Sequence, residues 1–199
     1  MINTFKNVLA VLVLSTLTTT AYAGISVGAN SDYIYRGISQ TDGSHSAWAQ
    51  YDWAHKSGVH VGAWVGQVDY ADGSDLETDI VVGWSNDNVR VAYFDYNYNG
   101  DADLDGSEIM LGADFMGVSF DYYLGQDDYT DYMELGYSKW GFDVAYGMWD
   151  DIGDNWSVSR AFDLPMGLKG SVGYHSFMAD DGSMMEDEDS FVFGIHKSF

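Results

Sequence analysis

Three aspartates have the most specific spacing for chemistry in this sequence, within Asp101-Ala102-Asp103-Leu104-Asp105-Gly106. Alternate carboxylates followed by glycine match the first half of a calcium-binding loop, in which oxygen atoms converge on one cation and the glycine permits a sharp turn. The second half does not match, because the twelfth position is Gly112 and not a bidentate glutamate. Two interpretations therefore stand: Ca²⁺ bound by Asp101, Asp103 and Asp105, or a solvated acidic loop. No other cofactor is expected.

Other charged residues alternate with apolar ones, which is the pattern of β-strands that have one polar face. In residues 76–84, Glu77 and Asp79 fall on one side, whereas Leu76 and Ile80 fall on the other. A helix would scatter these acids around its circumference. The same parity brings further charges to one face, and we expect them to form a charge network in the lumen of a barrel: Arg36, Glu77, Asp79, Arg90, Glu108, Asp143 and Lys169.

Histidines His60, His175 and His196 share this inner face. No Ser-His-Asp arrangement or metal-ligand spacing accompanies them, so we interpret them as hydrogen-bonding groups of the lumen and predict no enzyme activity.

The period-two pattern recurs in twelve segments, each about as long as a tilted membrane-spanning strand of ~9–11 residues. We predict an all-β fold, an antiparallel up-and-down transmembrane β-barrel of about twelve strands, with ten or fourteen as alternatives. A lipocalin-like or sandwich protein would also alternate. The parity of one segment is unclear, because Arg160 falls in register with Trp156 and Phe162. The strands are expected at 25–35, 46–55, 59–70, 75–84, 89–98, 107–115, 118–125, 132–139, 142–150, 155–163, 167–177 and 189–199.

The connections between these segments differ in length by parity. Those after even-numbered strands are short, and most of those after odd-numbered strands are longer or acidic, such as 99–106 and 178–188. Outer-membrane barrels have short periplasmic turns and long outer loops. The sequence ends with Phe199 on the apolar face of the last segment, which resembles the C-terminal signal that barrel assembly machinery recognises.

Composition and the N-terminus indicate export. Lys6, an apolar run over 8–17 and Ala21-Tyr22-Ala23 fit a signal peptide, so we expect residues 1–23 to be cleaved and 24–199 to form one barrel domain. The mature chain has 31 acidic and seven basic residues, a net charge of −24, which disfavours nucleic-acid binding. There is no cysteine, and 15 Tyr, 10 Phe and 7 Trp argue against disorder.

The stretch Ser31-Asp32-Tyr33-Ile34-Tyr35-Arg36-Gly37-Ile38-Ser39-Gln40-Thr41-Asp42-Gly43 resembles the opening signature of an uncharacterised proteobacterial family labelled Gcw_chp. The resemblance continues through the Ser57-Gly58 turn and the acidic strand around Leu76-Glu77, and we expect it over the whole mature chain. It implies export and an outer-membrane barrel, with no established activity. In this stretch, Arg36 is expected to pair with a carboxylate such as Glu77; a selectivity or ligand-binding role is the alternative.

Three functions remain open for such a barrel. A narrow channel or porin-like passive transporter of small solutes is favoured by a lumen of mixed charge. A structural or surface-binding barrel without an open pore is favoured by the bulky inward residues Trp48, Trp64 and Trp149. An enzyme ranks last. The expected partners are outer-membrane lipid and lipopolysaccharide, whose divalent cations the acidic loops could share; the oligomeric state is not predicted.

Overall fold

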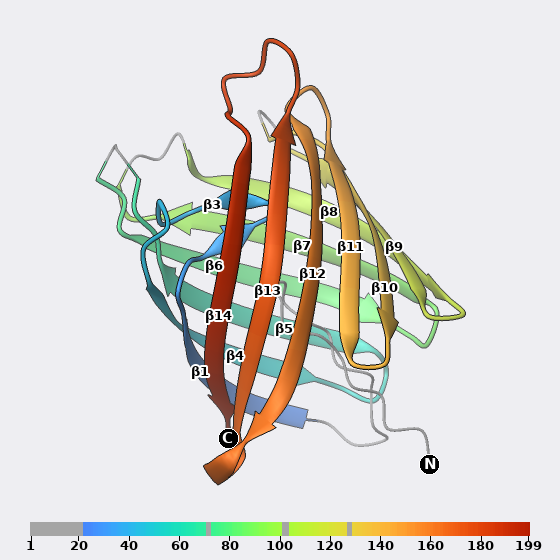
Figure 1. The fold of residues 1–199 in the computed structure, drawn as a ribbon. Coiled ribbons are helices and arrows are strands. Elements are labelled where there is room, and N and C mark those ends of the chain that lie inside the picture. Colours follow the sequence, from blue (N-terminus) through green and yellow to red (C-terminus); the bar gives the residue numbers. More distant parts are fainter. Residues whose placement is uncertain (1–21, 71–72, 101–103, 127–128) are drawn as a thin grey trace.

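The computed structural model describes residues 22–70, 73–100, 104–126 and 129–199, which form a closed antiparallel barrel (Figure 1). The predicted twelve-stranded barrel is confirmed: each wall strand pairs with its neighbours in the chain, and the first pairs with the last. No helix among the described residues has the length and apolar character needed to cross a bilayer. The wall strands are β1 (Tyr22–Asn30), β4 (Ser46–Ala54), β5 (Val59–Gln67), β6 (Leu76–Ser85), β7 (Val89–Tyr98), β8 (Gly106–Phe115), β9 (Val118–Gly125), β10 (Tyr132–Lys139), β11 (Phe142–Trp149), β12 (Gly153–Leu164), β13 (Leu168–Ala179) and β14 (Glu188–Ser198).

The wall separates apolar from polar side chains as the alternation predicts. In β6, Ile80 and Val82 are exposed on the outer surface, whereas Glu77 and Asp79 are buried toward the lumen. The other strands repeat this arrangement, so the outer surface is a band of exposed aliphatic and aromatic residues. A band of this kind suits a barrel that contacts lipid.

Replacing Ile80 with arginine is expected to destabilise the barrel in lipid vesicles by about 2–4 kcal/mol, because Ile80 lies on the outer face in the middle of a strand. Urea unfolding followed by tryptophan fluorescence measures this change. The matched control is Asp87→Arg in the exposed β6–β7 turn, where the cost should be about 0–1 kcal/mol. Equal costs at the two positions would contradict a lipid-facing Ile80.

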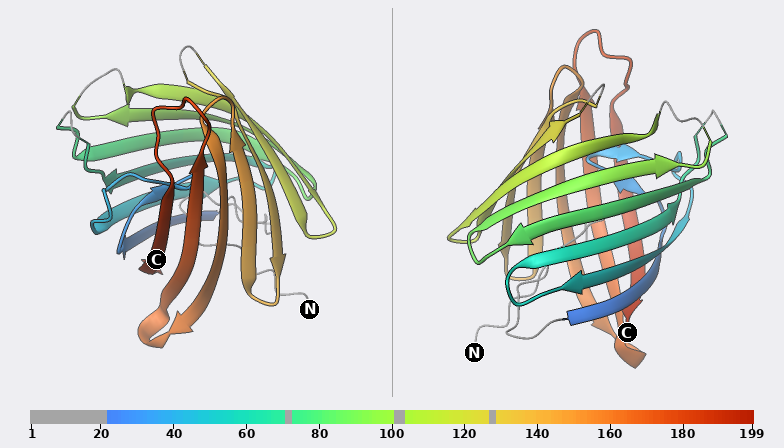
Figure 2. Two further views of the ribbon diagram at one scale, coloured as in Figure 1. Left: turned by 45° about the horizontal axis from the view of Figure 1, so that its top comes forward. Right: turned by 180° about the vertical axis from the view of Figure 1, so that it is seen from behind.

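Short turns join strands at one end of the barrel, and longer connections join them at the other (Figures 1 and 2). Three of the short turns place an apolar residue and a glycine at positive φ: Met116-Gly117, Trp140-Gly141 and Met166-Gly167. Two consecutive residues at positive φ give the backbone twist that tight hairpins favour. The third turn also contains the only proline of the sequence, in the short 3-10 helix η2 (Pro165–Gly167).

Residues 31–45 differ from the prediction. The first strand was expected to run to residue 35, but β1 ends at Asn30 and the chain then folds into the barrel as a small hairpin of β2 (Ile34–Tyr35) and β3 (Ile38–Ser39). Figures 1 and 2 show this hairpin enclosed by the wall. Arg36 and Gly37 make its turn at positive φ, and the flanking Asp32 is buried among hydroxyl groups. The chain therefore leaves the wall after Asn30 and reverses inside the barrel, so residues 31–35 are not part of a wall strand.

Two further expectations concern the strand ends. β1 begins at Tyr22, so cleavage before Gly24 would remove its first two residues; the rest of the predicted signal peptide lies outside the described residues. In β12, whose parity was unclear, Ser157 and Ser159 face the lumen and Arg160 is exposed on the outer surface.

Candidate functional site in the barrel lumen

Arg36 is the centre of the most highly organised polar contact in the lumen. It lies at the tip of the β2–β3 hairpin, and its Nη1 and Nη2 atoms donate to Oε1 and Oε2 of Glu108 over 2.6 and 2.7 Å. The Arg36 side chain is 6% exposed and that of Glu108 is fully buried. Tyr96 also donates to Glu108 Oε2, over 2.9 Å. A buried carboxylate is tolerated when it is paired and hydrogen-bonded in this way.

Four aromatic rings surround the same guanidinium. Its carbon lies 4.0 Å from the ring centre of Tyr123, 4.3 Å from Tyr132, 4.7 Å from Tyr35 and 4.9 Å from Trp149. Cation–π attraction is stronger when both partners are desolvated. These rings come from the hairpin and from β9, β10 and β11, so one side chain joins the hairpin to separate parts of the wall.

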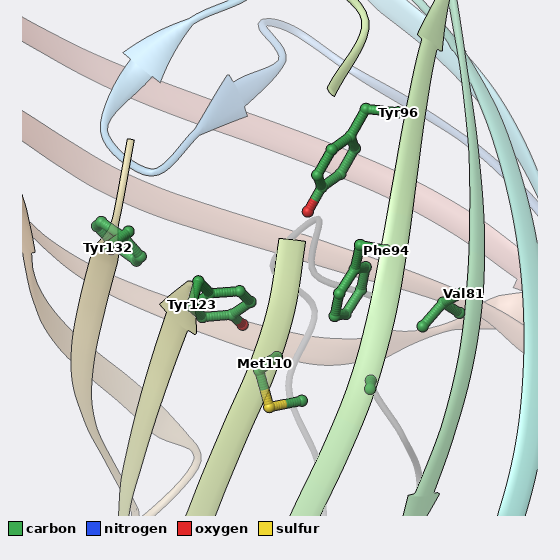
Figure 3. Close-up of a cluster of buried hydrophobic side chains, with 7 residues drawn as sticks. Val81, Phe94, Tyr96, Met110, Tyr123 and Tyr132 are labelled. Carbon is green, nitrogen blue, oxygen red and sulfur yellow. The ribbon is translucent and has the colours of Figure 1, made fainter. Parts of the chain in front are cut away.

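A cluster of buried side chains from the wall packs against Tyr35 of the hairpin. Figure 3 shows inward residues of β6 to β10 gathered beside the hairpin, among them Phe94 and Met110. The Tyr35 hydroxyl donates to that of Tyr96 over 3.2 Å.

A second group of contacts holds the base of the hairpin to β14. Asp32 accepts hydrogen bonds from the hydroxyls of Ser39, over 2.7 Å, Thr41, over 2.9 Å, and Ser190 of β14, over 3.3 Å. The backbone amide of Ser39 donates to Glu188, also of β14, over 2.9 Å. Side chains therefore make most of the polar contacts that seat the hairpin.

Arg36 pairs with an inner-face carboxylate as expected, but with Glu108 and not with Glu77, because the turn at Arg36 directs the guanidinium toward β8. Glu77 instead accepts a hydrogen bond from the hydroxyl of Tyr98 over 2.8 Å. Among the predicted network, only Arg36 and Glu108 are paired with each other in the described part of the chain.

The other predicted lumen charges have different partners. Arg90 of β7 pairs with Asp114 on the adjacent strand β8 and, over 2.8 Å, with Asp121 on β9, the next strand beyond it. Lys169 pairs with Asp163 near the β12–β13 turn. Asp143 accepts a hydrogen bond from Ser138 over 2.6 Å. Separate ion pairs and hydrogen bonds between nearby strands therefore take the place of one continuous charge network.

Two acids remain incompletely satisfied. Glu77 and Asp79 are 2% and 7% exposed, and Oε2 of Glu77 and Oδ1 of Asp79 have no hydrogen-bond partner among the described residues. The same holds for Nε2 of His60, which is inward-facing as predicted. No cluster of three or more histidine or carboxylate side chains suited to a metal ion occurs in the described ranges.

Beneath the hairpin lies a cavity of about 50 Å³, enough for a few water molecules. Arg36, Asp79 and Glu134 supply charged groups to its lining, and His175 and Asn155 supply polar ones. The hairpin and the wall both contribute side chains to its lining.

The predicted calcium ligands Asp101 and Asp103 lie outside the described residues. Asp105 is described, and its Oδ1 accepts a hydrogen bond from the backbone amide of Tyr98 over 2.7 Å. This contact joins the end of β7 to the β7–β8 connection. In the other acidic loop, Asp187 accepts from the amide of Ala179 over 2.9 Å.

Sequence reasoning missed the aromatic partners of Arg36. Tyr123, Tyr132 and Trp149 share the inner parity of their strands, so that parity was an available signal. Their convergence on one guanidinium depends on the relative placement of strands, which alternation does not specify. Trp64, predicted to be inward, packs against Tyr33 of the hairpin with ring centres 5.2 Å apart.

Known proteins resemble this chain in sequence and in fold. The family model described as "Bacterial protein of unknown function (Gcw_chp)" matches residues 15–108. The resemblance to this family is confirmed. The match contains both Arg36 and Glu108 and ends there, so it covers about the first half of the chain rather than all of the mature part. No curated protein matches the sequence.

Among solved structures, the chain is similar to the KdgM porin, with a TM-score of 0.53 and 12% identity, over 88% of this chain and 99% of that chain. A structure of KdgM porin in complex with disordered oligogalacturonate gives a TM-score of 0.52 and 11% identity, over 89% and 99% of the two chains. The likeness shows that the Gcw_chp-like chain has a porin-like barrel fold.

Proposed function

We propose that this protein is an outer-membrane channel for small solutes that prefers cations, with the hairpin of residues 31–45 as its constriction. The observation that carries the proposal is the hairpin itself, which occupies the lumen and is held there chiefly by side chains around Arg36 and Asp32. A segment held in this way can be displaced without breaking the pairing of the wall strands. The porin-like fold supports a channel in general and names no solute.

The charges of the lumen support a preference for cations. Inward-facing carboxylates outnumber the two wall bases, Arg90 and Lys169, and these bases are already paired with acids. A narrow passage lined by unbalanced negative charge concentrates cations and repels anions. Glu77 and Asp79 also face the lumen, from β6.

Conductance across a planar bilayer tests this proposal. Asn30 pairs with Ser46 where β1 and β4 meet, so a four-residue Gly-Ser linker can replace residues 31–45 and still join the strands. We expect the linker variant to conduct several-fold more than the wild type, because the constriction is removed. In a potassium chloride gradient, the reversal potential of both proteins should indicate cation preference.

A structural barrel without an open pore is the second candidate, and the dense packing around Arg36 favours it. Under this alternative, the wild type shows the heat-dependent gel migration of a folded barrel but does not conduct, and only the linker variant, which lacks the hairpin, conducts. An anion-selective reversal potential would contradict the proposed preference but not the channel.

A further inference from the structure

Three of the seven basic residues of the described chain form ion pairs with carboxylates, and four do not: Lys56 in a turn, Lys197 near the end of β14, and Lys139 and Arg160 on the wall. Arg36, Arg90 and Lys169 face the lumen, and each pairs with a carboxylate. Lys139 and Arg160 face outward and have no ion pair among the described residues, although the chain has 31 acidic residues. Among these four bases, Lys139 and Arg160 lie next to each other on the outer face of the wall, and two adjacent cations without an acidic partner point to an anion from outside the chain.

Lys139 and Arg160 lie side by side at one level of the wall. Lys139 pairs across strands with Phe142, and Phe142 pairs with Arg160, so the three occupy β10, β11 and β12 in order. All three side chains are exposed. Because neighbouring strands are about 4.8 Å apart, the two bases are about 10 Å apart at the backbone and flank one phenylalanine. Two long, flexible side chains at this separation can reach the same phosphate.

Aromatic rings lie beneath both cations. The Lys139 Nζ atom lies 4.6 Å from the ring centre of Trp140, and the Arg160 guanidinium carbon lies 4.9 Å from that of Phe142. Trp140 is 84% exposed at the tip of its turn. Rings of this kind are typical of the boundary between hydrocarbon and headgroups, and long basic side chains extend from it toward phosphate.

The position of the pair identifies the leaflet. Lys139 is the last residue of β10, next to the short turns, which are at the periplasmic end in the proposed outer-membrane orientation. The longer connections at the opposite end carry acids such as Asp180 and Asp181. The two bases therefore lie at the level of the inner-leaflet headgroups.

We propose that Lys139 and Arg160, with Trp140 and Phe142, bind the phosphate of an anionic phospholipid in the periplasmic leaflet. The inference rests on the proposed outer-membrane location and not on conduction. Each base near an anionic lipid surface contributes severalfold in affinity. The site would hold this side of the barrel at a defined depth.

Native mass spectrometry of the detergent-solubilised barrel, titrated separately with phosphatidylglycerol and phosphatidylcholine, tests the site. We expect the wild type to prefer phosphatidylglycerol, and the double variant Lys139→Gln/Arg160→Gln to lose on the order of tenfold in that preference. The matched control is Lys56→Gln/Lys169→Gln, which removes the same charge from the same end and should retain the preference.

Three results would overturn the inference: no preference in the wild type, an unchanged preference in the double variant, or displacement of the lipid by an equal concentration of inorganic phosphate. Heat-dependent gel migration shows which variants are folded. Since lipid binding and conductance are measured separately, a conducting barrel without lipid preference contradicts only this inference. A barrel that prefers phosphatidylglycerol and never conducts contradicts only the channel.

Discussion

Replacing Arg36 with alanine is expected to lower the free energy of unfolding by about 3–5 kcal/mol, because the substitution leaves the carboxylate of Glu108 buried without its cation. The four aromatic rings around the guanidinium also lose their shared partner. Reversible urea unfolding in detergent micelles, followed by tryptophan fluorescence, measures the change. The same variant should conduct more than the wild type if the released hairpin leaves the lumen.

Two further variants separate the contributions at this site. Arg36→Lys keeps the charge but cannot form the bidentate contact or cover four rings with a planar group, so it should recover only part of the stability. The double variant Arg36→Ala/Glu108→Ala should cost less than the sum of the two single variants, because no unpaired charge remains. Additive costs would show that the two side chains do not act as a pair.

Replacing Gly37 with alanine should be the second most damaging change, at about 2–4 kcal/mol, from backbone strain and overpacking together. Gly37 has a φ of 91°, and a Cβ atom added to it would lie 2.5 Å from Cβ of Asn155 and 3.3 Å from Cβ of Phe177. Both of those atoms are attached directly to wall backbone and cannot move aside easily. Unfolding in urea measures the cost as before.

The control for Gly37 lies in the same segment. Gly43 has a φ of 73°, and a Cβ atom added there would have no neighbour within 4 Å. Gly43→Ala should therefore lower the free energy of unfolding only by the cost of a positive φ at a residue with a side chain, about 1–2 kcal/mol. Equal losses of stability in Gly37→Ala and Gly43→Ala would show that Gly37 is required only for its positive φ. The hairpin tip would then not be packed tightly against the wall.

The wall of this barrel was largely predictable because it depends on local information. Alternation along β6 places Glu77 on the inner face and Ile80 on the outer face, independently of which strands pair with β6. The turn at Trp140-Gly141 lies where the alternation is interrupted. Period two in the sequence translates directly into two faces, so the strand count could be predicted without any tertiary contact.

The lumen contacts were less predictable because they depend on relations between distant segments. Residues 31–35 continue the alternation of β1, and nothing in that pattern distinguishes a wall strand from a strand inside the barrel. Arg36 and Glu108 are 72 residues apart, and their meeting depends on where the hairpin reverses. The parity of Glu77 made it an equally plausible partner. The acids at 101 and 103 lie where the structure describes nothing.

The attachment of the hairpin to β14 sets an order of events during biogenesis. Asp32 accepts a hydrogen bond from Ser190, and the Ser39 amide donates to Glu188; both partners belong to β14, which follows every other wall strand in chain order. Ser31 likewise donates its amide to the carbonyl of Phe193 over 2.8 Å. The hairpin, although it is near the start of the chain, can be fully seated only after β14 has closed the barrel against β1. A chain truncated before β14 lacks these partners, so a fully seated hairpin reports that the wall of the barrel is complete.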